Sequence, residues 1–207
     1  MKRKMLCSVC IAGAIALSGC SFFKKDTSHE IVINDAKDIK EKDDSFNDPF
    51  VEGQLIYELE DCNIYDNLSD AKISIDDMMD PHNVFYDQEM GEKYQTVNDY
   101  IESDGKIKNQ FKLVVLDMKI ENKNAVGMIK KNEFNVANFA LRGGENVSQY
   151  NISYFDKASI LDPERPLYYN LEQGKSIDVR IGYFVKEDDI ENMVGVISDS
   201  DVQFFLK

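Results

Sequence analysis

The feature that most constrains the fold is a strict period of two in the distribution of apolar side chains. In residues 175–185 (KSIDVRIGYFV) every second residue is apolar. Successive side chains of a β-strand point to opposite faces, so this period predicts a strand with one buried face. The apolar positions are Ile177, Val179, Ile181, Tyr183 and Val185.

A second strand is predicted for residues 111–122 (FKLVVLDMKIEN). Its second half alternates, with Leu116, Met118 and Ile120 between charged residues, whereas its first half is apolar on both faces. A strand that is buried on both faces at one end fits the middle of a sheet. We therefore expect this segment to be a central strand.

Further strands are predicted at residues 55–64, 134–142, 150–155 and 202–206. In the first of them, Cys62 and Ile64 fall out of phase with Leu55, Tyr57 and Leu59, which predicts a β-bulge near Asp61. Gly143-Gly144 indicates a hairpin turn. About seven strands separated by polar turns predict an antiparallel β-sandwich.

Two short helices are also predicted. Residues 96–102 begin with Thr96, and Asp99 three residues later can complete a capping box. Residues 188–194 carry an apolar stripe and are followed by Gly195, which can end a helix. We expect both stripes to cover the core.

The N-terminus has the order of an export signal. Lys2-Arg3-Lys4 precedes an apolar run at residues 5–17, which is short for a membrane span, and Leu17-Ser18-Gly19-Cys20 follows. This tetrapeptide closely resembles the lipobox of bacterial lipoproteins. The resemblance implies a diacylglycerol on the Cys20 thiol and cleavage before it. An ordinary secretory signal or a short membrane anchor is the alternative.

These boundaries predict three parts: a signal peptide at residues 1–19, a lipidated flexible tether at 20–50, and a folded domain at 51–207. Ile31-Val32-Ile33 is the apolar patch of the tether, and it either adds a strand or remains part of the tether. The expected location is the outer face of the cytoplasmic membrane, where two lipid chains anchor a protein stably.

The formal net charge is −14, and it becomes −17 once Lys2, Arg3 and Lys4 are removed. So acidic a surface repels phosphate backbones, which excludes nucleic acid as an expected partner. Anionic lipid headgroups should repel it as well. The net charge therefore predicts that the lipid on Cys20 holds the chain at the membrane.

The segments LVVLDMKIENKN and YNLEQGKSIDVRIGYFV, together with the closing strand, resemble immunoglobulin-like domains of unknown function in lipoproteins of low-GC Gram-positive bacteria. The resemblance covers residues 51–207, and it implies a sandwich related to the mycobacterial immunoprotective extracellular antigen. It brings no active-site residues. Residues 76–105 form a longer connection than these domains have. The matching positions are Val115, Asp117, Asn122, Gly174 and Ser176.

Catalytic and metal-binding patterns are weak in this sequence. Cys62 is the only cysteine after Cys20 and is expected to be a small buried residue. His82, the one histidine of the domain, lies in a turn-like Asp-Pro-His sequence. Acidic loops could offer oxygen ligands to Ca²⁺, but none matches an EF-hand. We expect no catalytic residue, metal or cofactor; the acidic positions are Asp76, Asp77, Asp80, Asp199 and Asp201.

Tyr168 and Tyr169 follow a proline-containing loop and could form an exposed contact for a protein or a glycan. Alternatively, one ring packs into the core while the other lies flat on the surface. Tether and sandwich together favour a non-enzymatic binding module in the cell envelope. The alternatives are an envelope-acting hydrolase or metal-dependent enzyme, and an accessory subunit of a transporter.

Overall fold

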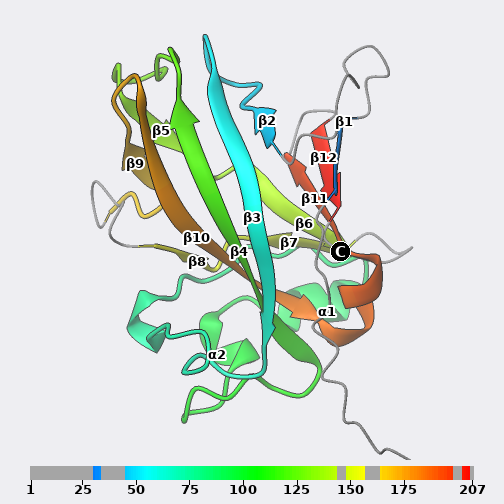
Figure 1. The fold of residues 1–207 in the computed structure, drawn as a ribbon. Helices are drawn as coiled ribbons and strands as arrows, with labels where there is room; N and C mark the ends of the chain where they lie inside the picture. Colours follow the sequence, from blue (N-terminus) through cyan, green and yellow to red (C-terminus); the bar gives the residue numbers. More distant parts are fainter. Residues whose placement is uncertain (1–29, 34–44, 144–147, 157–163, 198–201, 206–207) are drawn as a thin grey trace, which may run out of the picture.

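Two antiparallel sheets pack face to face in the computed structural model, which describes residues 30–33, 45–143, 148–156, 164–197 and 202–205 (Figure 1). The front sheet has the order β2-β3-β4-β10-β8, the back sheet has the order β1-β12-β11-β6-β7, and β5 pairs with β9. The predicted antiparallel β-sandwich is confirmed. The strands are β1 (Glu30–Ile33), β2 (Ser45–Asn47), β3 (Leu55–Tyr65), β4 (Phe111–Asn122), β5 (Glu133–Asn135), β6 (Phe139–Gly143), β7 (Ser148–Asn151), β8 (Tyr154–Phe155), β9 (Tyr168–Asn170), β10 (Lys175–Lys186), β11 (Val194–Ile197) and β12 (Val202–Phe205).

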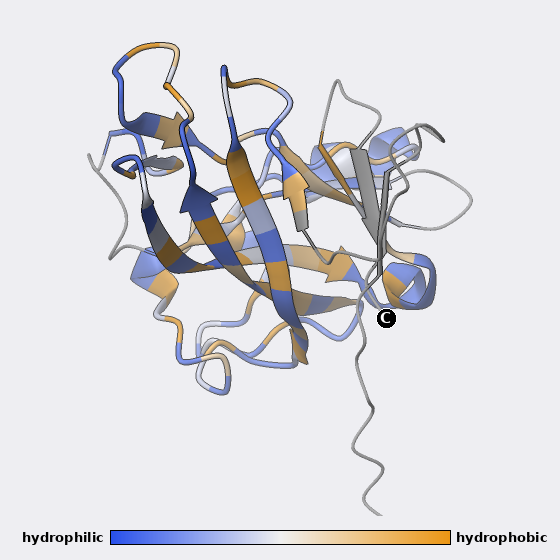
Figure 2. Ribbon diagram, turned by 45° about the horizontal axis from the view of Figure 1, so that its top comes forward, coloured by the Kyte–Doolittle hydropathy of each residue, from blue (hydrophilic) through white to orange (hydrophobic). Residues whose placement is uncertain are grey.

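The long strands form where period-two alternation predicts them. β4 has the predicted bounds, and β10 pairs with it in unbroken register from Lys175 opposite Asn122 to Lys186 opposite Phe111. The predicted bulge in β3 is confirmed by a register shift between Leu59 and Asp61. Figure 2 shows hydrophobic and hydrophilic residues alternating along the central strands.

Two predicted strands are each divided in the structure. Residues 134–142 form β5 and then β6, which pair in different sheets, and residues 150–155 contribute to β7 in the back sheet and to β8 in the front sheet. The chain changes sheets inside each apolar run, which hydrophobic periodicity alone does not reveal. For this reason the described part of the chain has more strands, and shorter ones, than the seven predicted.

The folded domain begins before the predicted boundary at residue 51. β1 pairs antiparallel with β12, so the patch at residues 31–33 does add a strand. β2 pairs with β3, and Phe46 is buried in the core beside Tyr57. The tether predicted for residues 20–50 is thus wrong at its C-terminal end, because residues 45–50 belong to the sandwich.

The segment between β3 and β4, residues 66–110, covers the outer face of the front sheet at one end. It contains a 3-10 helix η1 (Ile75–Asp77), α1 (Gln88–Lys93) and α2 (Val97–Tyr100). Tyr100 stacks on Phe184 of β10 at 4.7 Å and meets Phe111 of β4 at 4.7 Å. This covering segment explains why the first half of β4 is apolar on both faces.

The predicted helices are present but short. In α2 the Asp99 carboxylate accepts the Thr96 N–H, which completes the predicted capping box. The predicted helix at residues 188–194 is a 3-10 helix η3 (Glu187–Asn192). Sequence periodicity did not indicate α1, whose N-terminus is capped by the Asp87 carboxylate. No helix in the part of the chain that the structure describes is long and apolar enough to cross a membrane.

Candidate binding site

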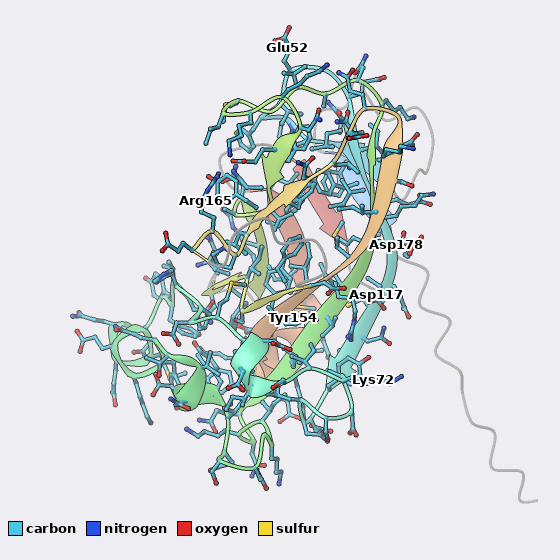
Figure 3. The ribbon with its side chains drawn as sticks, turned by 90° about the vertical axis from the view of Figure 1, so that its left-hand side faces the viewer. Glu52, Lys72, Asp117, Tyr154, Arg165 and Asp178 are labelled. Atoms are coloured by element: carbon cyan, nitrogen blue, oxygen red, sulfur yellow. The ribbon has the colours of Figure 1, made fainter. Side chains whose placement is uncertain are left out.

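The two ends of the sandwich differ, and the candidate site lies at the end where β4 gives way to β5. We call this the upper end (residues 48–54, 122–138 and 164–175) and the end formed by residues 66–110 the lower end (Figure 1). Figure 3 shows Glu52 at the tip of the upper end, Arg165 below it, and Lys72 toward the lower end.

A chain of buried polar groups runs beneath the upper end. The Tyr57 hydroxyl donates to Asp48 Oδ2 at 3.3 Å and lies 2.7 Å from the Tyr169 hydroxyl. Since the Tyr57 proton points to the carboxylate, Tyr169 is the donor in the second bond. The Phe50 N–H donates to Asp48 Oδ1 at 2.8 Å. Burial raises the pKa of Asp48 despite these hydrogen bonds.

A second polar cluster forms the wall of the site. Glu133, whose side chain is 3% exposed, pairs with Arg165 at 2.5 Å and with Lys130 at 3.0 Å. Hydrogen bonds from Arg165 and then Lys130 lower the pKa of Glu133. The Arg165 guanidinium also lies 3.7 Å from the centre of the Tyr168 ring. One carboxylate thus faces two cations, which leaves the cluster with a net positive charge.

Between these groups lies a cavity of about 90 Å³. Pockets for drug-sized molecules measure roughly 300–1,000 Å³, so this cavity is suited to a single side chain or a similarly small group. Its rim carries Met128 and Ile129, which are 81% and 67% exposed. The lining residues are Asp48, Phe50, Val51, Gly127, Met128, Ile129, Glu133, Phe134, Asn135, Asn138, Phe139, Tyr168 and Ile197.

The loop that carries this rim is closed by its own backbone. The Gly127 N–H donates to the Lys131 carbonyl at 3.1 Å, and the Glu133 N–H donates to the Lys130 carbonyl at 3.0 Å. A Cβ on Gly127 would lie 2.1 Å from the Glu133 carbonyl oxygen, so only glycine fits here. The exposed apolar side chains therefore project from a preformed turn.

Tyr168 and Tyr169, the two tyrosines predicted to contact a partner, differ in their burial. Tyr168 is half-buried under Arg165 and lines the cavity. Tyr169 is fully buried, because β9 turns its ring toward the core, where it packs against Phe134 and Phe155. The prediction of a surface contact is corrected for Tyr169, and for Tyr168 it stays a prediction.

The remaining candidate residues do not join this site. Cys62 is half-buried, and burial, followed by the charges of Asp61 and Asp117, raises the pKa of its thiol to about 12. A thiol with that pKa is protonated at neutral pH and therefore a poor nucleophile. His82 is exposed on a lower-end loop, where its carbonyl accepts a hydrogen bond from the Asn151 amide.

The acidic residues considered for Ca²⁺ fall into three groups, of which the first, Asp76 and Asp77, lies in η1. The carboxylate of Asp80 accepts the Val97 N–H at 2.8 Å and so caps α2. Asp199 and Asp201 lie outside the described residues, as does Cys20. Within the described ranges, no three His, Cys, Asp or Glu side chains are grouped so that they could hold a metal ion.

Sequence reasoning missed Met128 and Ile129. They lie in NKNAVGMIKKN, residues 122–132, an acid-free stretch with three lysines between two predicted strands. Apolar residues that are adjacent in a connection, without strand or helix periodicity, are the signal that could have identified them. Together with the cavity they form a surface suited to contact with an apolar partner.

A family model described as Domain of unknown function (DUF5027) matches residues 52–207. No curated protein and no solved structure matches the chain. The matched range contains the Gly127–Lys131 turn, the Glu133–Arg165 pair and Tyr168, whereas Asp48, Phe50 and Val51 precede it.

Proposed function

We propose that this chain, which belongs to the DUF5027 family, is a lipid-anchored surface lipoprotein whose sandwich is a non-enzymatic binding module. Its binding surface is the upper end. The observation that carries this proposal is the exposure of Met128 and Ile129, at 81% and 67%, on a closed turn beside a cavity. Large apolar side chains held together in the solvent commonly mark contact sites.

The proposed location at the membrane is based on the N-terminal sequence. The order of Lys2-Arg3-Lys4, the apolar run and Leu17-Ser18-Gly19-Cys20 is that of a lipoprotein signal. A lipid on Cys20 supplies the attachment, and the sandwich supplies a rigid frame for the contact loop. The two parts of the proposal are separable, because anchoring and binding depend on different residues.

The anchor is tested by metabolic labelling with a fatty-acid analogue. We expect label on the wild-type chain and none on the Cys20→Ser variant, with the chain lost from the membrane fraction. Equal labelling of both proteins would overturn the anchor.

The binding surface is tested by a photo-crosslinking residue placed at Ile129 in the full-length protein in cells. We expect an adduct with an envelope component at this position. The matched control carries the same residue at Tyr86, which is 84% exposed at the lower end. Adducts in equal yield at both positions, or none at Ile129, would contradict a binding surface at the upper end.

A further inference from the structure

Acidic residues are distributed unevenly over the sandwich. Residues 66–112, which form the lower end and the start of β4, hold eleven acidic and five basic side chains. The neighbouring η3 adds four acidic residues and no basic one. At the upper end, by contrast, acidic and basic side chains balance at five each, and residues 122–132 hold three lysines and no acid. The net charge of −14 therefore describes the lower end better than the upper.

The two ends are so far apart that the charges of one end have little electrostatic effect at the other. The 12 residues of β4 connect them, and a strand of that length spans roughly 40 Å. Charges are screened over about 8 Å at physiological ionic strength. A surface that meets the upper end consequently interacts with the charges of that end, which include exposed Lys130 and Lys131 and the carboxylate of Glu52 at its tip, and the acidic lower end contributes little.

The Gly127–Lys131 turn carries both apolar and positively charged side chains. Met128 and Ile129 form its exposed apolar tip. Directly after them come Lys131, which is exposed, and Lys130, whose side chain is 72% exposed. The Glu133 carboxylate is shared between Lys130 and Arg165 and neutralises only one of the two cations. The turn thus presents an apolar tip with a positively charged rim.

We propose that this turn enters the interface of an anionic bilayer. Met128 and Ile129 then lie at the boundary of headgroups and acyl chains, and Lys130 and Lys131 reach the headgroup phosphates. The inference rests on the proposed function, since it names the partner of the same surface. A protein partner is less favoured because the cavity of about 90 Å³ accepts little more than one side chain, whereas the two exposed residues project beyond it.

Such a contact would orient the sandwich relative to the bilayer. A lipid on Cys20 holds the chain near the membrane but does not by itself determine which end of the sandwich faces the bilayer. A second contact at the Gly127–Lys131 turn directs the upper end toward the bilayer and the acidic lower end away from it. The lower end, with exposed Val84 and Tyr86, then faces outward.

The test uses residues 20–207 with Cys20→Ser, a chain that keeps every described element and lacks the lipid. Sedimentation with vesicles of phosphatidylcholine containing 30% phosphatidylglycerol is compared with pure phosphatidylcholine. We expect binding to the first only. Met128→Ser/Ile129→Ser should weaken it roughly tenfold or more, and Lys130→Gln/Lys131→Gln about fivefold per lysine. The matched control, Val84→Ser/Tyr86→Ser, should bind like the parent chain.

A fluorescence readout locates the contact. Met128→Cys is labelled with a polarity-sensitive dye in a chain that also carries Cys62→Ser, so that the dye has a single thiol to react with. We expect a blue shift on anionic vesicles, and none with the dye on Tyr86→Cys. No binding to anionic vesicles, equal losses in the control and tip variants, or the absence of a blue shift for the dye at position 128 would overturn the inference. Fatty-acid labelling of Cys20 is unaffected by these outcomes, so the anchor stands or falls separately.

Discussion

The aromatic cluster under the covering segment at the lower end and the Gly127–Lys131 turn at the upper end use apolar residues in opposite ways. At the lower end, Tyr94 and Tyr100 from the covering segment pack against Phe111 and Phe184, and all four rings are buried. At the upper end, Met128 and Ile129 extend from the Gly127–Lys131 turn into the solvent. A 45-residue connection shields one end, and a short loop leaves the other open.

This difference separates stability from binding. Buried aromatic side chains contribute through burial and ring contacts, so the buried rings of the lower end should contribute far more to the free energy of unfolding than the exposed side chains of the turn. Exposed side chains contribute little to folding, and the upper end can retain them only at the risk of unwanted association. The exposed side chains of Met128 and Ile129 should therefore affect binding without affecting stability, and the buried aromatic residues of the lower end should do the reverse.

The largest expected effect is that of Tyr100→Ala. Removal of this buried ring from between Phe111 and Phe184 should lower the free energy of unfolding by about 3–5 kcal/mol. Urea unfolding followed by circular dichroism measures it. Tyr86→Ala, at an exposed lower-end position, is the control and should change stability by less than about 0.5 kcal/mol. Similar losses in both variants would contradict the covering role of this segment.

Gly127→Ala should cost about 1–3 kcal/mol, because the new Cβ would clash with the Glu133 and Lys130 carbonyl oxygens. Gly91→Ala in α1 is the matched substitution at the lower end. A Cβ there meets nothing within 4 Å, and alanine favours a helix, so stability should be equal or higher. A neutral result at Gly127 would mean that the turn is not held closed as described.

Tyr57→Phe should cost on the order of 1.5 kcal/mol, since it leaves the buried Tyr169 hydroxyl and the Asp48 carboxylate without their shared partner. Thermal unfolding compares it with Tyr168→Phe at the half-buried neighbouring position. If the two variants lost the same stability, the hydroxyl chain beneath the upper end would have no special role.

The buried Asp48 carboxyl group should make the free energy of unfolding depend on pH in a defined direction. Its pKa in the folded state is raised, mainly by burial. Its contribution to stability is thus fully present below the unfolded pKa near 3.8 and is lost as the pH rises through the folded pKa. In Asp48→Asn this loss should be absent, so the variant gains stability relative to wild type as the pH rises. Stability curves between pH 3 and pH 8 check this.

Glu133 should make the free energy of unfolding depend on pH in the opposite direction, because Arg165 and Lys130 lower the pKa of its carboxyl group. Its contribution is present above the unfolded pKa and is lost as the pH falls through the folded value. Glu133→Gln should consequently lack part of the acid-induced destabilisation of the wild type. An identical pH profile in the two carboxamide variants would contradict the different surroundings of these carboxylates.

The smallest effect on folding is expected for Met128→Ser/Ile129→Ser. Both side chains are largely exposed, so the free energy of unfolding should stay within about 0.5 kcal/mol of wild type. Urea unfolding of the same protein samples used for vesicle binding measures it. A larger loss would show that the apolar tip belongs to the core and would remove the contrast with the lower end.

The sequence by itself determined the strands whose environment repeats along their length. β4 and β10 keep one face inward over 12 residues each, so a period of two was enough to place them. The bulge in β3 was equally local, because the apolar positions change parity within three residues. The Thr96–Asp99 capping box likewise needs only neighbours in the chain.

Only the tertiary structure decided which strands share a sheet and which apolar residues stay in the solvent. The division of residues 134–142 between two sheets, the burial of Tyr169 next to half-buried Tyr168, and the exposure of Met128 all depend on partners distant in sequence. Hydrophobic periodicity reports the direction of a side chain relative to its neighbours. It contains no information on what the rest of the fold brings against that side chain, and burial at the upper end is set by that packing.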